Sequence, residues 1–80
     1  MIEKVIVLDQ VDPVVFYGVN NSNILLLKTL YPKLRFVARG RAIKIFGDEE
    51  DIQIFETFLG RLVNYCSNYN KLNEEAILDF

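Results

Sequence analysis

The chain has 80 residues, 51% of them hydrophobic, and a formal net charge of −2; this length is enough for one folded domain with a thin core. No run of about eighteen uncharged apolar residues occurs, and the start "MIEKVIVLDQ" lacks the apolar centre of a secretory signal, so we expect a cytoplasmic domain outside any membrane. A single cysteine, Cys66, and the absence of histidine exclude an intramolecular disulfide and a zinc-type ligand set, so no metal or other cofactor is expected here.

The first expected element is a strand over residues 2–8, "IEKVIVL", in which alternation predicts one buried face. That face consists of Ile2, Lys4, Ile6 and Leu8. After it, Asp12 and Pro13 are typical of the N-cap and first position of a helix, and Gly18 is expected to end that helix after little more than one turn.

A second helix and a hairpin are expected next. The string "SNILLLKTLYP" has apolar residues at helical spacing and stops before Pro32. Its expected core face is Ile24, Leu27, Leu30 and Tyr31. "LRFVARGRAIKIF" then predicts two strands joined by a two-residue type II′ turn at Gly40 and Arg41. This register places Ala38 opposite Ile43, Phe36 opposite Ile45, Val37 opposite Lys44 and Arg35 opposite Phe46, with one face apolar and the other basic.

A long third helix is expected to begin after Asp48 and to end near Asn68, with acids in its first turn that complement the helix dipole. Its expected core positions are Ile52, Phe55, Leu59, Leu62, Val63 and Cys66. Asn73 then resembles the N-cap of another helix, which is unfinished at Phe80. We therefore expect a domain over residues 1–70 and, over residues 71–80, the start of a linker or helix toward further sequence.

Basic residues are concentrated in the middle of the chain. Between Pro13 and Gly47 there are six basic residues and no acid, whereas all eleven acids lie outside that stretch. The six are Lys28, Lys33, Arg35, Arg39, Arg41 and Lys44. Such a split produces a positive field that attracts a polyanion if the fold gathers these residues on one face; otherwise they are an ordinary solvated surface.

The expected element order predicts an α+β fold with a three-stranded antiparallel sheet and helices on one face. It resembles a type I KH domain, of order β-α-α-β-β-α, in which a G-x-x-G loop joins two helices and an isoleucine follows three residues later. Gly18-Val19-Asn20-Asn21 occupies that loop, and Ile24 occupies the isoleucine position. The strings "FYGVNN..NILLLK" and "VARGRAIKIFGDEEDIQ" resemble more closely the amino-terminal domain of the PhoH-like proteins, phosphate starvation-inducible cytoplasmic ATPases.

The resemblance implies an accessory domain that contributes RNA binding to an ATPase of RNA metabolism. The P-loop motif G-x-x-x-x-G-K-[ST] does not occur in these 80 residues, so ATP and magnesium would belong to a further domain, and this chain is not expected to be an enzyme. The expected partners are single-stranded RNA, that ATPase domain and a second copy of the chain. The alternative is a protein-docking or oligomerisation domain with a degenerate, non-binding KH loop.

The candidate RNA-contact residues are Gly18, Asn20, Asn21, Lys28, Arg35, Arg39, Arg41 and Lys44. In a KH-like arrangement Lys28, Arg35, Arg39 and Arg41 would lie along one groove. Its aromatic neighbours for unstacked bases would be Tyr17, Tyr31 and Phe46. The loop lacks a second glycine and any basic residue, so the alternative is that residues 20–22 only cap the second helix. Arg35 and Lys44 would then only keep an open sheet face hydrated.

The third helix carries a second apolar strip, Ile54, Phe58 and Tyr65, opposite its core face. This strip predicts either a protein-docking surface or a cover formed by residues 72–80. No catalytic site is expected, because the carboxylates of residues 48–51 diverge around a helix axis and Cys66 has no histidine base.

Overall fold

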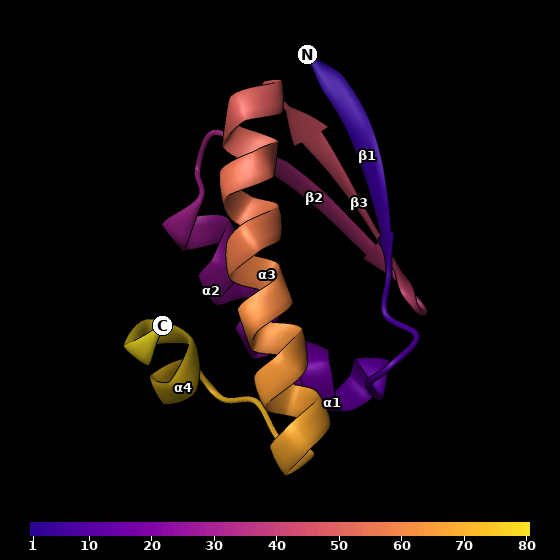
Figure 1. The fold of residues 1–80 in the computed structure, drawn as a ribbon, viewed down its shortest axis with the longest axis vertical. Helices are drawn as coiled ribbons and strands as arrows, with labels where there is room; N and C mark the ends of the chain where they lie inside the picture. The colour runs from indigo at the N-terminus through magenta and orange to yellow at the C-terminus, as the bar shows by residue number, and fades with distance from the viewer.

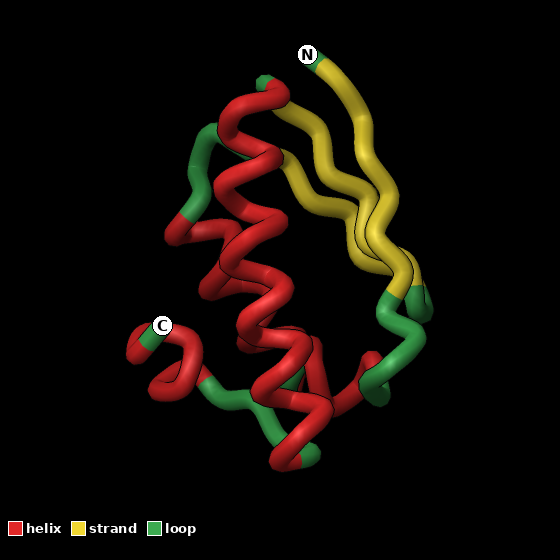
Figure 2. Tube along the Cα trace, viewed as in Figure 1, coloured by secondary structure: helices red, strands yellow, loops and turns green.

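The structure, a computed structural model that describes residues 1–80, is an α+β fold with its helices packed on one face of an open three-stranded antiparallel sheet (Figure 1). The strands are β1 (Ile2–Val7), β2 (Arg35–Arg39) and β3 (Ala42–Gly47), and the helices are α1 (Pro13–Tyr17), α2 (Ser22–Leu30), α3 (Glu49–Tyr69) and α4 (Glu74–Asp79). A 3-10 turn over Val19–Asn21 joins α1 to α2. The strand order is β1-β3-β2 (Figure 2), so the expected class and sheet are confirmed.

The hairpin of β2 and β3 has the register that the sequence predicts. Ala38 pairs with Ile43 and Phe36 with Ile45. Gly40 has a φ of +54°, and Arg41 does not have a positive φ, as a type II′ turn requires. Because the side chains of a strand alternate between faces, this register directs Ile43 and Ile45 into the core and Lys44 to the opposite face.

The strand β1 is less buried than its alternation predicts. It is an edge strand paired only with β3, and Ile2 at its start remains 44% exposed. Lys4 faces the helices as expected, but its ammonium group reaches Glu56 of α3 at 3.0 Å and is not buried. Only Ile6, half-buried, and Leu8, fully buried just beyond the strand, contribute to the core. The predicted burial of one face therefore holds at Ile6 and Leu8 but not at Ile2 and Lys4, because the helices do not cover the start of this edge.

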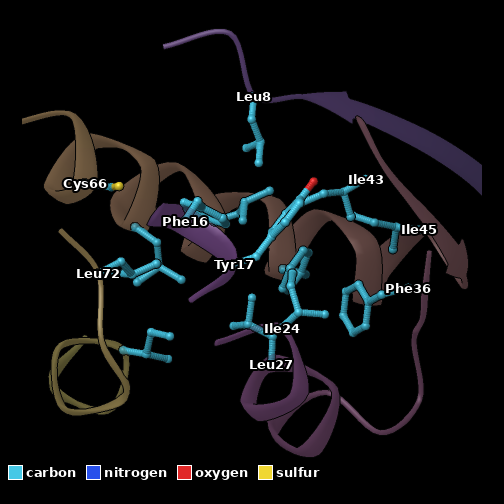
Figure 3. Packing of buried hydrophobic residues seen from close by; sticks show 14 of the residues in the cluster. Leu8, Phe16, Tyr17, Ile24, Leu27, Phe36, Ile43, Ile45, Cys66 and Leu72 are labelled. Carbon is cyan, nitrogen blue, oxygen red and sulfur yellow. The ribbon is translucent and has the colours of Figure 1, made fainter. Parts of the chain in front are cut away.

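The core is one cluster of 18 buried residues between the sheet and α3, to which α1, α2 and the C-terminal segment also contribute (Figure 3). Phe55 of α3 lies at its centre, with ring centroids 4.8 Å from Phe36 and 5.0 Å from Tyr31. The expected core positions of α3 are buried except Val63, which is half-buried. Leu30 was wrongly expected in the core: α2 ends there and Leu30 is 41% exposed, while Tyr31 leaves helical geometry and packs on Phe55.

The C-terminal segment folds back onto the same core. Asn70, with a left-handed φ of +53°, ends α3, and Leu72 and Ile77 are buried. Asn73 caps α4 as expected, its Oδ1 accepting a hydrogen bond of 2.8 Å from the Ala76 amide. The expected boundary at residue 70 therefore does not separate two packing units, since the residues after it belong to the same core.

Tyr17 connects α1 to the hairpin, since its hydroxyl donates a part-buried hydrogen bond of 2.7 Å to the Gly40 carbonyl. We expect Tyr17→Phe to lower the free energy of unfolding by about 1 kcal/mol at neutral pH, because that carbonyl loses its donor. Burial also raises the pKa of the Tyr17 hydroxyl. The stability that this hydroxyl contributes to the folded state is therefore complete below the ordinary tyrosine pKa of about 10. It is lost as the pH rises through the pKa of the hydroxyl in the folded state.

Urea unfolding of both proteins at neutral pH and at about pH 11 checks this prediction. Tyr17→Phe should lose less stability than the wild type between the two conditions. Some loss should remain, because burial also raises the pKa of Tyr31. An equal loss in both proteins would contradict the role of the Tyr17 hydroxyl.

Candidate functional site

The loop between α1 and α2 is defined by three residues with positive φ. Gly18 has φ +82° and ψ 171°, and Asn20 and Asn21 have φ +56° and +59°. Asn21 occupies the N-cap position of α2, but no side chain there accepts a capping hydrogen bond. Side-chain capping of α2 by residues 20–22 therefore does not explain the asparagines at these positions. Their side chains tolerate the left-handed backbone better than most residues do.

Gly18 is required by packing within the domain. A Cβ atom at this position would lie 2.8 Å from the Ser22 Oγ and 2.9 Å from the Asn23 Cγ. Asn23 is only 1% exposed, and its Nδ2 donates to the carbonyls of Phe16 at 3.0 Å and Leu72 at 2.9 Å. This one amide joins the end of α1, the start of α2 and the segment before α4.

Asn23 was not among the residues singled out from the sequence. In the run "NNSN" it resembles one more capping residue. Its spacing could have indicated that Asn23 is buried, because it lies four residues before Leu27 on the buried face of α2.

The loop borders a shallow hollow of about 420 Å³ shared with the start of α4. The hollow is lined by Gly18, Val19, Ser22, Asn23, Leu72, Asn73, Glu74 and Glu75. Two carboxylates and no basic residue line it, so its electrostatic potential disfavours a phosphate group. None of the basic candidates lines this hollow, although Tyr17, next to Gly18, reaches the carbonyl of Gly40 in the hairpin turn between Arg39 and Arg41.

Three of the six central basic residues meet at an open groove of about 840 Å³, where β2 begins and β3 ends. They are Lys28 from α2, Lys33 from the α2–β2 loop and Arg35 from β2. The other lining residues are Met1, Pro32, Leu34, Phe36, Val37 and Phe46. Met1 lines this groove. In Figure 1 the N-terminus and the end of β3 lie at the top of the view, whereas α1 lies near the bottom.

Arg35 also belongs to the helix-free side of the sheet. The strand register places nine side chains on this side, which we call the open sheet face: Glu3, Val5 and Val7 of β1, Ala42, Lys44 and Phe46 of β3, and Arg35, Val37 and Arg39 of β2. Three of them are basic and one is acidic. Five are apolar, including Val7, which is 58% exposed, and Phe46, which is half-buried.

Arg41 has a structural contact that the other central basic residues lack. Its Nη1 donates to the carbonyls of Leu8 at 3.1 Å and Val11 at 3.4 Å, which holds the connection between β1 and α1 against the hairpin turn. None of the six central basic residues has a carboxylate partner, because the only ion pair of the structure joins Lys4 to Glu56. Their charges are therefore available to an anion.

Of the three expected aromatic neighbours, only Phe46 lines the groove. Tyr17 is buried and its hydroxyl is engaged with Gly40. Tyr31 packs against Phe55 and Phe58. Phe46 is therefore the aromatic ring available for stacking beside the basic residues.

The second apolar strip of α3 is interrupted rather than open. The Phe58 ring centroid lies 5.7 Å from that of Tyr31, and the Tyr65 centroid lies 5.5 Å from that of Phe80. Ile54 remains 56% exposed. The alternative in which the C-terminal segment covers the strip therefore holds at Tyr65.

Cys66 is buried in the core, and burial, followed by the nearby Asp12 carboxylate, raises the pKa of its thiol. No group of three or more His, Cys, Asp and Glu side chains is arranged to hold a metal ion. No helix combines the length and apolar character needed to cross a bilayer.

No family model, curated protein or solved structure matches the chain. Support for a function therefore comes from the residues of the site.

Proposed function

We propose that this chain is a KH-like domain that binds single-stranded RNA and serves as the accessory amino-terminal domain of a PhoH-like ATPase. The observation that carries the binding function is the meeting of Lys28, Lys33 and Arg35 at one groove beside Phe46. The KH-like assignment is supported by the element order, by the central position of β3 and by the positive φ of Gly18 between α1 and α2.

The groove has the chemistry that a flexible polyanion requires. Its ammonium and guanidinium groups have no carboxylate partner and supply favourable contacts to phosphates. Phe46 and the Arg35 guanidinium offer planar surfaces on which unpaired bases stack. Single-stranded RNA has accessible base faces, whereas the bases of a duplex are stacked on one another and expose only their edges.

The ATPase context is a separate part of the proposal and rests on the sequence resemblance. ATP and magnesium would be bound by a P-loop domain that follows this one in the protein. Reading the coding sequence beyond Phe80 tests this part: a G-x-x-x-x-G-K-[ST] motif supports it, and continuation without such a motif contradicts it.

The binding function predicts a specific effect of neutralising the groove. We expect the double variant Lys33→Gln/Arg35→Gln to bind a short labelled single-stranded RNA about tenfold more weakly at low salt. The slope of log affinity against log salt should become shallower by about 1.4, because two phosphate contacts are removed. Fluorescence anisotropy over a salt series measures both quantities.

The matched control is Arg61→Gln/Lys71→Gln, which removes the same charge from outside the groove. The control should keep the salt slope of the wild type and most of its affinity. Equal losses in the two double variants would show that only net charge matters, and absence of binding by the wild type at low salt would reject the function.

A further inference from the structure

We infer that the RNA crosses the open sheet face, with one base stacked on Phe46, and that it does not use the loop at Gly18. This inference rests on the proposed RNA-binding function and assigns that function to a surface. Three features carry it: the charges around the loop, the residues of the open sheet face, and the continuity of that face with the groove.

The loop at Gly18 is unfavourable for a phosphate backbone. The carboxylates of Glu74 and Glu75 line the same hollow, and no basic side chain offsets them. They are held there because the segment around them is anchored by buried Leu72 and Ile77 and by the amide of Asn23. An RNA strand at this loop would therefore approach two negative charges.

On the open sheet face, basic residues are interspersed with apolar ones. Along β2, Arg35 and Arg39 are separated by about 13 Å, with Val37 between them. Lys44 lies opposite Val37 on β3, so three cations extend along the face. Exposed valines of β1 adjoin them and supply apolar surface for the bases.

The groove and the open sheet face form one continuous surface. Arg35, Val37 and Phe46 belong to both, so a strand held by Lys28 and Lys33 can pass the edge of β2 and reach Lys44 and Arg39. Arg35 is paired directly with Phe46, so the two side chains start from neighbouring positions on the same face, and the ring is half-buried. Such pairs of aromatic and guanidinium planes are what unstacked bases pack against.

Glu3 is the one unfavourable charge on this surface. It pairs with Phe46 from the side opposite Arg35 and is exposed. Its carboxylate lies beside the proposed base position and repels the phosphate backbone. Removing this charge should strengthen RNA binding. Because damage to the fold would weaken binding, an increase in affinity could not be attributed to misfolding.

A protein partner with acidic and apolar residues is the competing occupant of the same face. Two observations favour RNA over it. The positive charge continues beyond the sheet to Lys28 and Lys33, and such an extended row of charges suits a long polyanion. The one aromatic ring of the face, Phe46, is paired directly with an arginine, the combination against which unstacked bases pack.

The test uses matched carboxylate substitutions in the 80-residue chain and fluorescence anisotropy with a short single-stranded RNA at low salt. Glu3→Gln and Glu75→Gln change the net charge equally, one on the open sheet face and one beside the loop. We expect Glu3→Gln to raise the affinity about two- to fivefold and Glu75→Gln to change it by less than about twofold. Phe46→Leu should lower the affinity by about fivefold or more.

The outcomes separate the inference from the function on which it rests. If the wild type binds RNA but only Glu75→Gln changes the affinity, the loop is the site and the inference is overturned, while the proposed function stands. If the wild type does not bind RNA, the proposed function fails and the inference fails with it. Self-association that Phe46→Leu abolishes, without RNA binding, would make this face a protein contact and overturn both.

Discussion

Replacing Asn23 with alanine is expected to lower the free energy of unfolding by about 2 to 4 kcal/mol, because the buried carbonyls of Phe16 and Leu72 would both lose their donor. The substitution also leaves a small cavity at a position that is 1% exposed. Since the same amide holds Leu72, amide protons in α4 should exchange faster than in the wild type.

Urea unfolding and hydrogen exchange measure the two effects of Asn23→Ala. The matched control is Asn64→Ala on the exposed side of α3, which should change stability by less than about 0.5 kcal/mol. If Asn23→Ala had no larger effect than the control, or left the exchange of α4 unchanged, Asn23 would not join α4 to the core.

Gly18→Ala should also destabilise the domain, by about 2 to 3 kcal/mol. The φ of +82° and ψ of 171° belong to a region that only glycine occupies readily. In addition, the new Cβ would lie within 3.0 Å of the side chains of Ser22 and Asn23. Because Asn23 would have to move, its two hydrogen bonds would be weakened as well.

Gly60→Ala is the control for Gly18→Ala, because its Cβ would meet no atom within 4 Å on the exposed side of α3. This control should be stabilising by about 0.5 to 1 kcal/mol, since alanine favours a helix interior over glycine. Thermal or urea unfolding compares the two. If Gly18→Ala left stability unchanged but lowered RNA affinity, Gly18 would serve the ligand instead of packing within the domain.

The sequence predicts the hairpin and α3 well because local chemistry decides both. A glycine at the first turn position fixes the register of β2 and β3 at every pair from Arg35 to Ala38, and helical spacing identifies Phe55 and its neighbours. The burial of β1 was not predictable in the same way. Alternation reports that a strand has two faces, but whether helices cover the edge depends on packing that no local pattern specifies.

The candidate site was predictable in part. The concentration of basic residues is visible in the sequence, and the hairpin register correctly places Arg35 and Lys44 on the face opposite the apolar one. The acidic neighbours of the Gly18 loop were not predictable, because Glu74 and Glu75 come from a segment far along the chain. The role of Asn23 was hidden for the same reason, since one of its acceptors is the carbonyl of Leu72.

A backbone amide NMR titration of the chain with a short single-stranded RNA at two salt concentrations tests the central claim most directly. Binding across the open sheet face predicts shifts that weaken at high salt and are concentrated in residues 33–39 and 42–46 and around Val5, with residues 18–22 nearly unchanged. Shifts concentrated in residues 18–24, or no shifts even at low salt, would contradict it.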